Sequence, residues 1–463
     1  MLDTPNLLQT YHTTLETKFA NKLLINPRLN RQLVSFQANK NKPRYRWFRY
    51  KEGFSEGLIH YILDIIKPTG HILDPFAGIG TTLFVALERG LDVTGIELLP
   101  VGYEVMAVHH QLQTGDKTHF LQLIARWQST TPWKKEFVNT PFPHLKITNG
   151  AFPEETQQAI DSYRTALLQE SPTDQRLLQF VLMCVLEDMS YTRKDGQYLR
   201  WDYRSNRKQG RVPFDKGQII PFDQAIHQKF DEIYTDLDQV TIFDVPIWNK
   251  NMQLIQGSCL DQLPQLKTAS FDGIITSPPY ANRYDYTRTY ALELALLGVD
   301  ETEIRRLRQA MLSCTVENRD KPDLETYFSD DIYQQAQLAF SQQAELQTIL
   351  AYLESQKDAK LLNNTGIPRM IRNYFLEMAL VIFESARILK PNAPFVMVND
   401  NVRYGGIVIP VDLILSDFAQ QAGFDIEVIW VLPIGKGNSS QQMGTHGRES
   451  LRKCIYIWRR RLI

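Results

Sequence analysis

The chain has 463 residues, of which 43% are apolar and 22% are charged, and its 51 Lys and Arg balance 52 Asp and Glu. This length predicts two or three folding units, and the ordinary globular composition excludes wholesale disorder and collagen-like repeats. The near-zero net charge excludes a uniformly basic protein, but it allows a nucleic-acid enzyme whose basic residues gather on one face.

No segment of the sequence predicts export or membrane insertion. The first residues lack a basic start followed by an apolar run, and no stretch approaches the roughly 18 apolar residues that span a bilayer. The cysteines are scattered without a Cys-x-x-Cys pair, so we interpret them as reduced thiols; they are Cys184, Cys259, Cys314 and Cys454. We therefore expect a soluble, cytoplasmic protein.

A basic and aromatic segment covers residues 28–51. It holds eight Lys and Arg and no acidic residue, and Tyr45, Trp47, Phe48 and Tyr50 are interleaved with the basic residues near its end. One interpretation is a solvated arm. The other, which we favour, is a surface that follows a phosphate backbone, with Arg44 and Arg46 as contacts. The next segment, GFSEGLIHYILDIIK, has apolar residues at helical spacing and predicts a helix.

Residues 71–99 predict a strand, a tight turn, a helix and a second strand. The apolar run before Asp74 is typical of a strand buried on both faces, and TTLFVALERG is typical of the helix that crosses back, with Gly90 at its C-cap. Residues 92–96 predict the second strand, at whose end Glu97 stands. Such a βαβ unit indicates an α/β protein with a doubly wound, mostly parallel sheet.

The alternation of strands and helices fades between residues 105 and 250 and then returns. The middle stretch predicts helices and holds a second basic and aromatic segment at residues 193–216. We therefore predict three parts, which are 1–115 with the basic arm and the first half of the α/β domain, an inserted and largely helical module at 116–248, and 249–463 with the second half. The last part carries a helical insertion near 320–365.

The turn DPFAGIGTT, residues 74–82, joins the first strand to its helix. Its glycines let the backbone approach a ligand, and the helix N-terminus offers free N–H groups. A dinucleotide-binding turn would need a third glycine where Leu83 stands, and no Gly-Lys-Ser/Thr phosphate loop is present. Glu97 stands where an acidic side chain meets a ribose in such folds, although a plain exposed carboxylate is the alternative.

The later strand FDGIIT ends in SPPY, residues 277–280. Two consecutive prolines donate no backbone hydrogen bond and fix φ, so they end the strand and hold a rigid loop whose carbonyls can still accept. Ser277 before them and Tyr280 after them place acceptors beside a flat stacking surface. A simple turn is the alternative, but ligands of open α/β sheets bind at such strand ends.

Together the two motifs resemble those of the S-adenosylmethionine-dependent amino-methyltransferases of bacterial DNA, in particular the cytosine-N4 branch of restriction–modification methylases. The segments ANRYDYTRTYALELALLG (281–298) and KGNSSQQMGTHGRESLRKCIYIWRR near the C-terminus extend the likeness, which covers roughly residues 45–115 and 250–463. The resemblance implies a seven-stranded Rossmann-like sheet, S-adenosylmethionine as cofactor, double-stranded DNA as substrate and a separate companion restriction endonuclease. The first half of the domain would bind the cofactor and the second half would carry catalysis.

The resemblance also implies roles for individual residues. The expected cofactor contacts are Asp74, Pro75, Phe76, Gly78, Gly80, Thr81, Glu97, Phe54 and Ser55. The family's Gly-Asp after the third strand is Gly257-Ser258 here, so Asp261 is the candidate for the adenine contact. Ser277 and the Pro278 carbonyl are expected to accept from the target amino group, Pro279 to keep the loop rigid, and Tyr280 to stack on the extruded base. No metal is implied.

Other activities remain open. Adenine-N6 enzymes share both motifs but more often carry Asp or Asn at the position of Ser277. RNA amino-methyltransferases also share them, although no RNA-capture domain is recognised here. Cytosine-C5 chemistry needs a nucleophilic thiol, usually in Pro-Cys, and no cysteine follows a proline. A non-catalytic subunit is disfavoured because SPPY is intact.

The motif order resembles methylases that place target recognition between the two motifs, which makes 116–248 the predicted recognition module. Its candidate DNA contacts are Arg193, Lys194, Arg200, Arg204 and Arg207, for each of which a surface ion pair is the alternative. Asn399, Asp400 and Asn401 follow the strand PFVMV at the same sheet edge and are candidates for lining the site.

Overall fold

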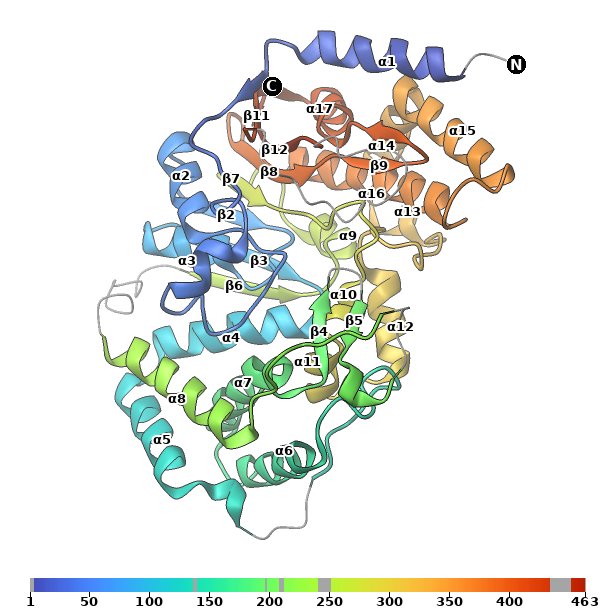
Figure 1. The fold of residues 1–463 in the computed structure, drawn as a ribbon. Coiled ribbons are helices and arrows are strands. Elements are labelled where there is room, and N and C mark those ends of the chain that lie inside the picture. Colours follow the sequence, from blue (N-terminus) through green and yellow to red (C-terminus); the bar gives the residue numbers. More distant parts are fainter. Residues whose placement is uncertain are drawn as a thin grey trace.

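The computed structural model describes residues 4–135, 140–195, 198–207, 212–239, 251–433 and 451–462. Its central element is an eight-stranded sheet with the order β1-β11-β12-β8-β7-β2-β3-β6 (Figure 1). The strands are β1 (Leu23–Ile25), β2 (His71–Asp74), β3 (Asp92–Glu97), β6 (Met252–Gln256), β7 (Gly273–Thr276), β8 (Pro394–Asp400), β11 (Phe424–Val431) and β12 (Lys453–Arg460). Neighbouring strands pair in parallel except at β12, which is antiparallel to both β8 and β11.

Strand β2 lies where the strand order reverses. From it the chain builds outward through β3 and β6 on one side and through β7 and β8 on the other. Ligands of open α/β sheets bind at the carboxyl ends of strands at such a switch point. Asp74 ends β2 and Thr276 ends β7, so both predicted motifs begin there. The doubly wound, Rossmann-like fold is confirmed.

The expected number of seven strands is wrong by one. Strand β1 pairs in parallel with β11 at the edge of the sheet, with Leu23 opposite Ile429 and Ile25 opposite Val431. A strand of three residues is too short to give a period of two in the sequence, so only its distant partner reveals it.

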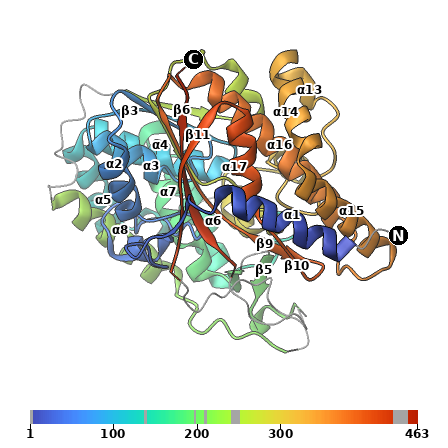
Figure 2. The ribbon, with the colours of Figure 1, turned by 90° about the horizontal axis from the view of Figure 1, so that it is seen from above.

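Helices cover both faces of the sheet, and Figure 2 shows them on its two sides. On one face lie α2 (Glu56–Ile66) and α3 (Thr81–Glu88), and on the other lie α9 (Cys259–Gln262), α16 (Ile367–Ile388) and α17 (Val411–Gln421). Successive side chains of β8 point to opposite faces of the sheet, so this strand contributes to both cores. Val396 and Val398 join the core of α2 and α3, whereas Phe395 and Met397 join the core of α16 and α17.

Further helices extend the second face. The predicted insertion near 320–365 contains α13 (Leu324–Tyr327), α14 (Asp330–Gln342) and α15 (Ala344–Asp358). The N-terminal helix α1 (Thr4–Phe19), which the sequence analysis does not predict, packs on α15 and α17 and buries Leu15 and Phe19 in their core. Among the described residues, no helix has both the length and the apolar character that crossing a bilayer requires.

A second, mostly helical lobe lies below the sheet in Figure 1. It contains α4 (Pro100–Thr114), α5 (Lys117–Thr130), α6 (Glu154–Leu167), α7 (Pro172–Met189), α8 (Phe222–Asp238), α11 (Ala291–Leu296) and α12 (Glu301–Ala310). These helices share a core of their own that includes Trp127, Tyr163 and Phe180. Between α7 and α8 an antiparallel hairpin pairs β4 (Thr192–Asp195) with β5 (Tyr198–Trp201). The predicted module boundary at 248 lies outside the described residues.

Candidate active site at the carboxyl edge of the sheet

The glycine turn after β2 is shaped by two backbone conformations that favour glycine. Gly78 has φ of 55° and Gly80 has φ of 82°. A Cβ on Gly78 would stand 3.2 Å from the ring of Tyr50, and one on Gly80 would stand 2.8 Å from Cγ of Met106. The turn is therefore confined both by its backbone and by its neighbours, and glycine is required at both positions.

Glu97, at the end of β3, holds this turn in place. Its Oε2 accepts from the Gly78 N–H at 2.8 Å and its Oε1 accepts from the Leu99 N–H at 2.7 Å. Burial raises the pKa of Glu97 to about 7, against the effect of these two donors. The carboxylate therefore titrates close to neutral pH at the edge of the turn.

Asp74 joins the strand ends that carry the two motifs. Its Oδ1 accepts from the Phe76 N–H at 3.1 Å and from the hydroxyl of Thr276 at 2.6 Å. Burial raises the pKa of Asp74 to about 6, although the hydroxyl donors favour its ionised form. A single carboxyl thus links the glycine turn to the residue immediately before SPPY.

The SPPY loop follows β7 and turns its polar atoms toward β8. Ser277 Oγ lies 3.2 Å from the carbonyl oxygen of Val398 and 3.2 Å from the hydroxyl of Tyr280. Burial raises the pKa of Tyr280, so its phenol stays neutral over the physiological range. The hydroxyls of Ser277 and Tyr280 are therefore hydrogen-bonded to each other, and both side chains are uncharged.

Both motifs line one cavity of about 420 Å³. The sequence-predicted residues in its wall are Phe54, Asp74, Pro75, Phe76, Gly78, Thr81, Glu97, Ser277, Pro278, Pro279, Tyr280, Asp400 and Asn401. This volume lies within the roughly 300–1,000 Å³ that is typical of small-molecule sites. Two loops about 200 positions apart in the sequence therefore meet over a shared space, as their positions at neighbouring strand ends predict.

Three predicted cofactor contacts lie outside this wall. Ser55 is the N-cap of α2, where its Oγ accepts from the Leu58 N–H at 3.2 Å and donates to the Leu33 carbonyl. Gly80 packs against Met106 and Phe84. Asp261 lies in the first turn of α9, while its neighbours Gly257, Ser258 and Cys259 line the cavity instead.

The cavity is also lined by residues that no sequence motif assigns to it. Lys51 and Glu52 come from the segment before Phe54, while Asn282, Tyr284 and Tyr286 come from the stretch after SPPY. Lys453, at the start of β12, pairs with Asp400 at the end of β8. No sequence pattern marks Glu52, which stands just after the basic segment and two residues before Phe54, as a residue of this wall.

The basic and aromatic segment at 28–51 is not the open surface that the sequence predicts. Its aromatic residues are buried, with Trp47 only 1% exposed, and Trp47 Nε1 donates to Asp236 of α8 at 2.7 Å. Arg44 is fully buried and pairs with Glu88, and Arg46 Nε donates to the same Asp236 at 3.0 Å. The segment docks on the lower lobe, so the assignment of Arg44 as a DNA contact is wrong and Arg46 is engaged internally.

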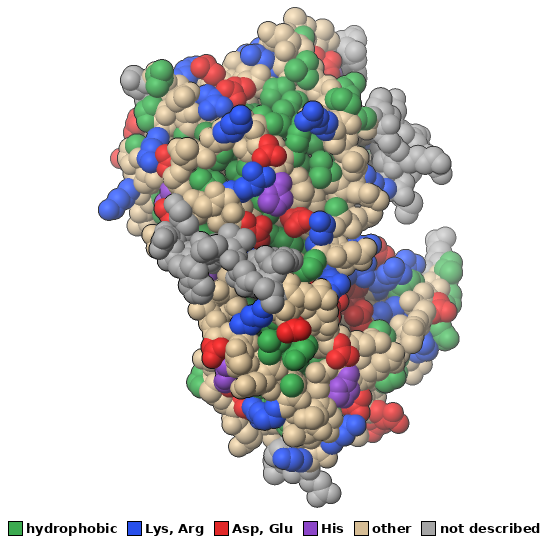
Figure 3. Space-filling view, turned by 90° about the vertical axis from the view of Figure 1, so that its left-hand side faces the viewer, with side chains coloured by type: hydrophobic (Ala, Val, Ile, Leu, Met, Phe, Trp, Pro, Cys, Tyr) green, Lys and Arg blue, Asp and Glu red, His purple; other side chains and the backbone are tan. Residues whose placement is uncertain are grey.

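In the second basic and aromatic segment, 193–216, some of the predicted DNA contacts are also engaged inside the protein, while others are exposed. Lys194 is 4% exposed, which rules it out as a DNA contact. Arg204 pairs with Asp202 at 2.7 Å, and Arg207 donates to the backbone carbonyls of residues 146, 147 and 149. Arg193 is exposed. Arg200 is half-exposed, pairs with Asp195 at 3.4 Å and packs on the ring of Phe214, and these two remain the candidates. On the face shown in Figure 3, Lys and Arg are mixed with Asp and Glu, and the outline is indented between the two lobes.

Residues at the end of β8 complete the wall. Burial raises the pKa of Asp400, and its charge in turn helps raise the pKa of Tyr280. Asn399 Nδ2 donates to the hydroxyl of Tyr374 at 2.9 Å and is fully buried, so it supports the strand end rather than facing the cavity. Most of the segment KGNSSQQMGTHGRESLRK, residues 436–453, lies outside the described residues.

The two ends of the cavity differ in chemistry. Carboxylates and turn amides line the end beside β2 and β3, whereas hydroxyls, a proline carbonyl and tyrosine rings line the end beside β7 and β8. Acceptors beside an aromatic face are what an amino-bearing heterocycle requires.

Comparison with known proteins agrees with this geometry. Residues 25–107 match the N6/N4 family model described as DNA methylase. The chain is 49% identical over 459 residues to the Type II methyltransferase M.AvaI of Nostoc sp. (strain PCC 7120 / SAG 25.82 / UTEX 2576), covering 98% of this chain and 94% of that protein, and equally to that of Anabaena variabilis. It is 39% identical over 472 residues to the Type II methyltransferase M.BsoBI of Geobacillus stearothermophilus, covering 96% and 91%.

Proposed function

Because the chain belongs to the type II DNA methyltransferases of the N6/N4 family, whose methyl donor is S-adenosylmethionine, we propose that it methylates the exocyclic N4 amino group of cytosine in double-stranded DNA. The observation that carries the proposal is the single cavity walled by the glycine turn on one side and by Ser277, Pro278 and Tyr280 on the other.

The end of the cavity beside β2 and β3 suits S-adenosylmethionine. The missing Cβ of Gly78 leaves room against Tyr50, and the Glu97 carboxylate, which lines the cavity, would accept from the two ribose hydroxyls. Asp74 and Phe76 would face the methionine end. The cofactor supplies a methyl group already activated by the positive sulfonium, so the protein contributes alignment, which can be worth about 7 kcal/mol or more.

The end beside β7 and β8 suits an extruded base. Ser277 can donate its proton to the Val398 carbonyl, which leaves its lone pairs free to accept from the target amino group together with the Pro278 carbonyl. These acceptors would orient the two N4 protons and favour a nitrogen with a usable lone pair. Extrusion costs a few kcal/mol, of which stacking on Tyr280 would offset about 1–3 kcal/mol.

The transferred methyl group replaces one N4 proton, which must leave the base. Asp400 is the carboxyl on the Tyr280 side of the cavity, where burial raises its pKa and the ion pair with Lys453 acts in the opposite direction, toward the ionised form. We therefore propose Asp400 as the residue that accepts the N4 proton, because the hydroxyl of Ser277 cannot hold that proton at neutral pH.

Ser277 favours cytosine N4 as the target over adenine N6. The related enzymes that modify adenine more often carry Asp or Asn at this position. The part of the lower lobe within 116–248 is the proposed recognition module, with Arg193 exposed and Arg200 half-exposed on its β4–β5 hairpin. A separate restriction endonuclease of the same specificity would be the functional companion of such an enzyme.

The test is direct. The protein is incubated with methyl-labelled S-adenosylmethionine and DNA from a methylation-deficient host, and the DNA is digested to nucleosides. Label in N4-methylcytosine is expected. Label in N6-methyladenine would overturn the choice of base, and label found only when bulk tRNA replaces DNA would overturn the choice of nucleic acid.

A further inference from the structure

Lys194 is buried at a site where a charged ammonium costs free energy. Its ammonium lies 2.5 Å from Glu293 Oε1 of α11 and sits over the ring of Tyr290, 4.6 Å from the ring centre, and of Phe48, 5.1 Å away. Burial disfavours the charged ammonium, but Glu293 and Glu187 outweigh it and raise the pKa of Lys194. A buried charge persists only when such partners are built around it.

The contacts of Lys194 continue to the wall of the cavity. The hydroxyl of Tyr290 donates to one carboxylate oxygen of Glu52, and the hydroxyl of Tyr284 donates to the other. Glu52 and Tyr284 both line the cavity. The ring of Tyr290 also stacks on Tyr50 at 5.1 Å, with 16° between the planes, and Tyr50 is a further wall residue.

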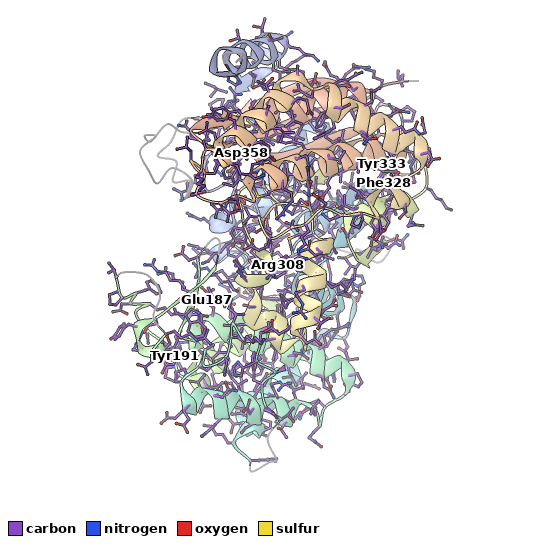
Figure 4. All side chains as sticks on the ribbon, turned by 90° about the vertical axis from the view of Figure 1, so that its right-hand side faces the viewer. Glu187, Tyr191, Arg308, Phe328, Tyr333 and Asp358 are labelled. Carbon is purple, nitrogen blue, oxygen red and sulfur yellow. The ribbon has the colours of Figure 1, made fainter. Side chains whose placement is uncertain are left out.

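The backbone of Lys194 is held from the same side. Its N–H donates to Glu187 Oε1 at 2.9 Å, and its carbonyl accepts from the ammonium of Lys51, which also lines the cavity. Glu187 is labelled in Figure 4, where it lies at the level at which the lower lobe meets the rest of the molecule. Strand β4 therefore contacts the cavity wall directly through Lys51, and it reaches Glu52 and Tyr50 of the wall through the ring of Tyr290.

The opposite face of the hairpin is the exposed one. Successive side chains of a strand point to opposite faces, so Arg193 beside Lys194 is exposed, and it stands opposite Arg200 of β5 in the register. Arg193 is thus the chain neighbour of the buried anchor, and Arg200, which pairs with Asp195, faces Arg193 across the hairpin.

We propose that Lys194 is a positioning residue that fixes the β4–β5 hairpin against the wall formed by Glu52 and Tyr284. The contacts of Arg193 and Arg200 on the duplex then set which nucleotide can enter the cavity. This inference rests on the proposed function, because it assumes that the hairpin meets DNA while the cavity receives the base.

A purely structural ion pair would predict something different. Its loss would lower the stability of the protein without separating binding from catalysis. A positioning role predicts that DNA and cofactor still bind, but that the target base arrives misplaced, since small errors of alignment cost rate rather than affinity.

The experiment compares two neutralised pairs in the full-length protein. Lys194→Met with Glu293→Gln removes the anchor together with its closest carboxylate, while Glu187 keeps Lys51 as an ion partner. Arg126→Met with Glu170→Gln is the matched control, because that pair lies on the far side of the lobe from the hairpin and neither residue lines the cavity. A third variant, Tyr290→Phe, removes only the hydroxyl that reaches Glu52. For each we would measure the melting temperature, the affinities for S-adenosylmethionine and for unmethylated plasmid DNA, and the single-turnover methylation rate.

The anchor variant should keep both affinities within about threefold and lose at least tenfold in single-turnover rate, and Tyr290→Phe should lose several-fold. The control should keep its rate. Equal rate losses in the anchor and control variants, or an unchanged rate in Tyr290→Phe, would overturn the inference even if the anchor variant failed to fold. A wild-type protein inactive on DNA would refute the proposed function instead.

Discussion

The hydroxyl of Thr276 donates a 2.6 Å hydrogen bond to Oδ1 of Asp74, joining two residues that are 202 positions apart in the chain. One ends the strand before SPPY and the other begins the glycine turn. The bond spans the switch point of the sheet and sets the two sides of the cavity relative to each other.

Replacing Thr276 by Val should weaken cofactor binding. The donor that favours the ionised form of Asp74 would be lost, so the pKa of Asp74 should rise above about 6 and less carboxylate would be present at neutral pH. We expect a several-fold rise in the Kd for S-adenosylmethionine at pH 7 that disappears at pH 8.5, measured by calorimetry. Thr276→Ser keeps the donor and should behave as wild type; an equal loss in both variants would contradict this explanation.

Gly78→Val should abolish cofactor binding. The added side chain would start 3.2 Å from the Tyr50 ring and extend into the turn, at a φ of 55° that β-branched residues avoid. Gly90→Val is the matched control, because Gly90 also has positive φ but a Cβ there meets no atom within 4 Å. If both variants bind the cofactor, or both lose it, the turn is not the contact we infer.

The affinity for S-adenosylmethionine should depend on pH through two carboxyls. Glu97 has a pKa of about 7 and Asp74 of about 6, both raised by burial, so both are protonated as the pH falls. Affinity should fall by about tenfold per pH unit per group below these values. Glu97→Gln should flatten the curve between pH 7 and 6 and leave the fall below pH 6, and a pH-independent wild type would contradict the assignment.

The same two carboxyls should make the stability of the cofactor-free protein depend on pH in the opposite direction from the affinity. Their pKa values are raised above those of the unfolded chain, so the folded state holds more protons between about pH 4 and 7. Their stabilising contribution is therefore present at the acid end and is lost as the pH rises through 7.

Tyr280→Ala should impair turnover while sparing cofactor affinity. The loss of stacking, about 1–3 kcal/mol, corresponds to a rate or base-binding defect of about 5- to 150-fold. Tyr280→Phe keeps the ring and loses only the hydroxyl that lies 3.2 Å from Ser277, so it should retain most of the single-turnover rate. An unimpaired Ala variant would remove Tyr280 from the site.

Arg193→Ala and Arg200→Ala should each weaken DNA binding and reduce the slope of log K against log salt by about one, if each contacts one phosphate. Arg126→Ala on α5 is the control, because Arg126 is similarly exposed but pairs with Glu170 away from the hairpin. Fluorescence anisotropy across a salt series measures both quantities. A slope unchanged in all three variants would place the DNA elsewhere.

The sequence was sufficient where a pattern is local. The strand before Asp74, the helix after Gly80 and the strand PFVMVND follow from apolar periodicity and glycine placement, and all three are present. The meeting of the two motifs also follows, because parallel strands on both sides of a switch point end at the same edge.

The sequence was insufficient where a residue's environment is set by distant parts of the chain. Arg44 and Lys194 have the appearance of surface cations, but Glu88 and Glu293 neutralise them in the interior. Trp47 looks like an exposed stacking residue until Asp236, 189 positions later, accepts its N–H. Glu52 has no recognisable motif, and only the two tyrosine hydroxyls that converge on it show its place in the wall.

Strand β1 has a consequence for synthesis of the protein. Leu23–Ile25 emerges from the ribosome early, whereas its partner Ile429–Val431 is made near the end. At about 5–20 residues per second, the nascent segment would wait on the order of 20 s or longer with its edge unsatisfied. Leu24 and Ile25 remain largely exposed even in the folded protein, so until β11 is made this segment presents apolar side chains together with an unpaired strand edge.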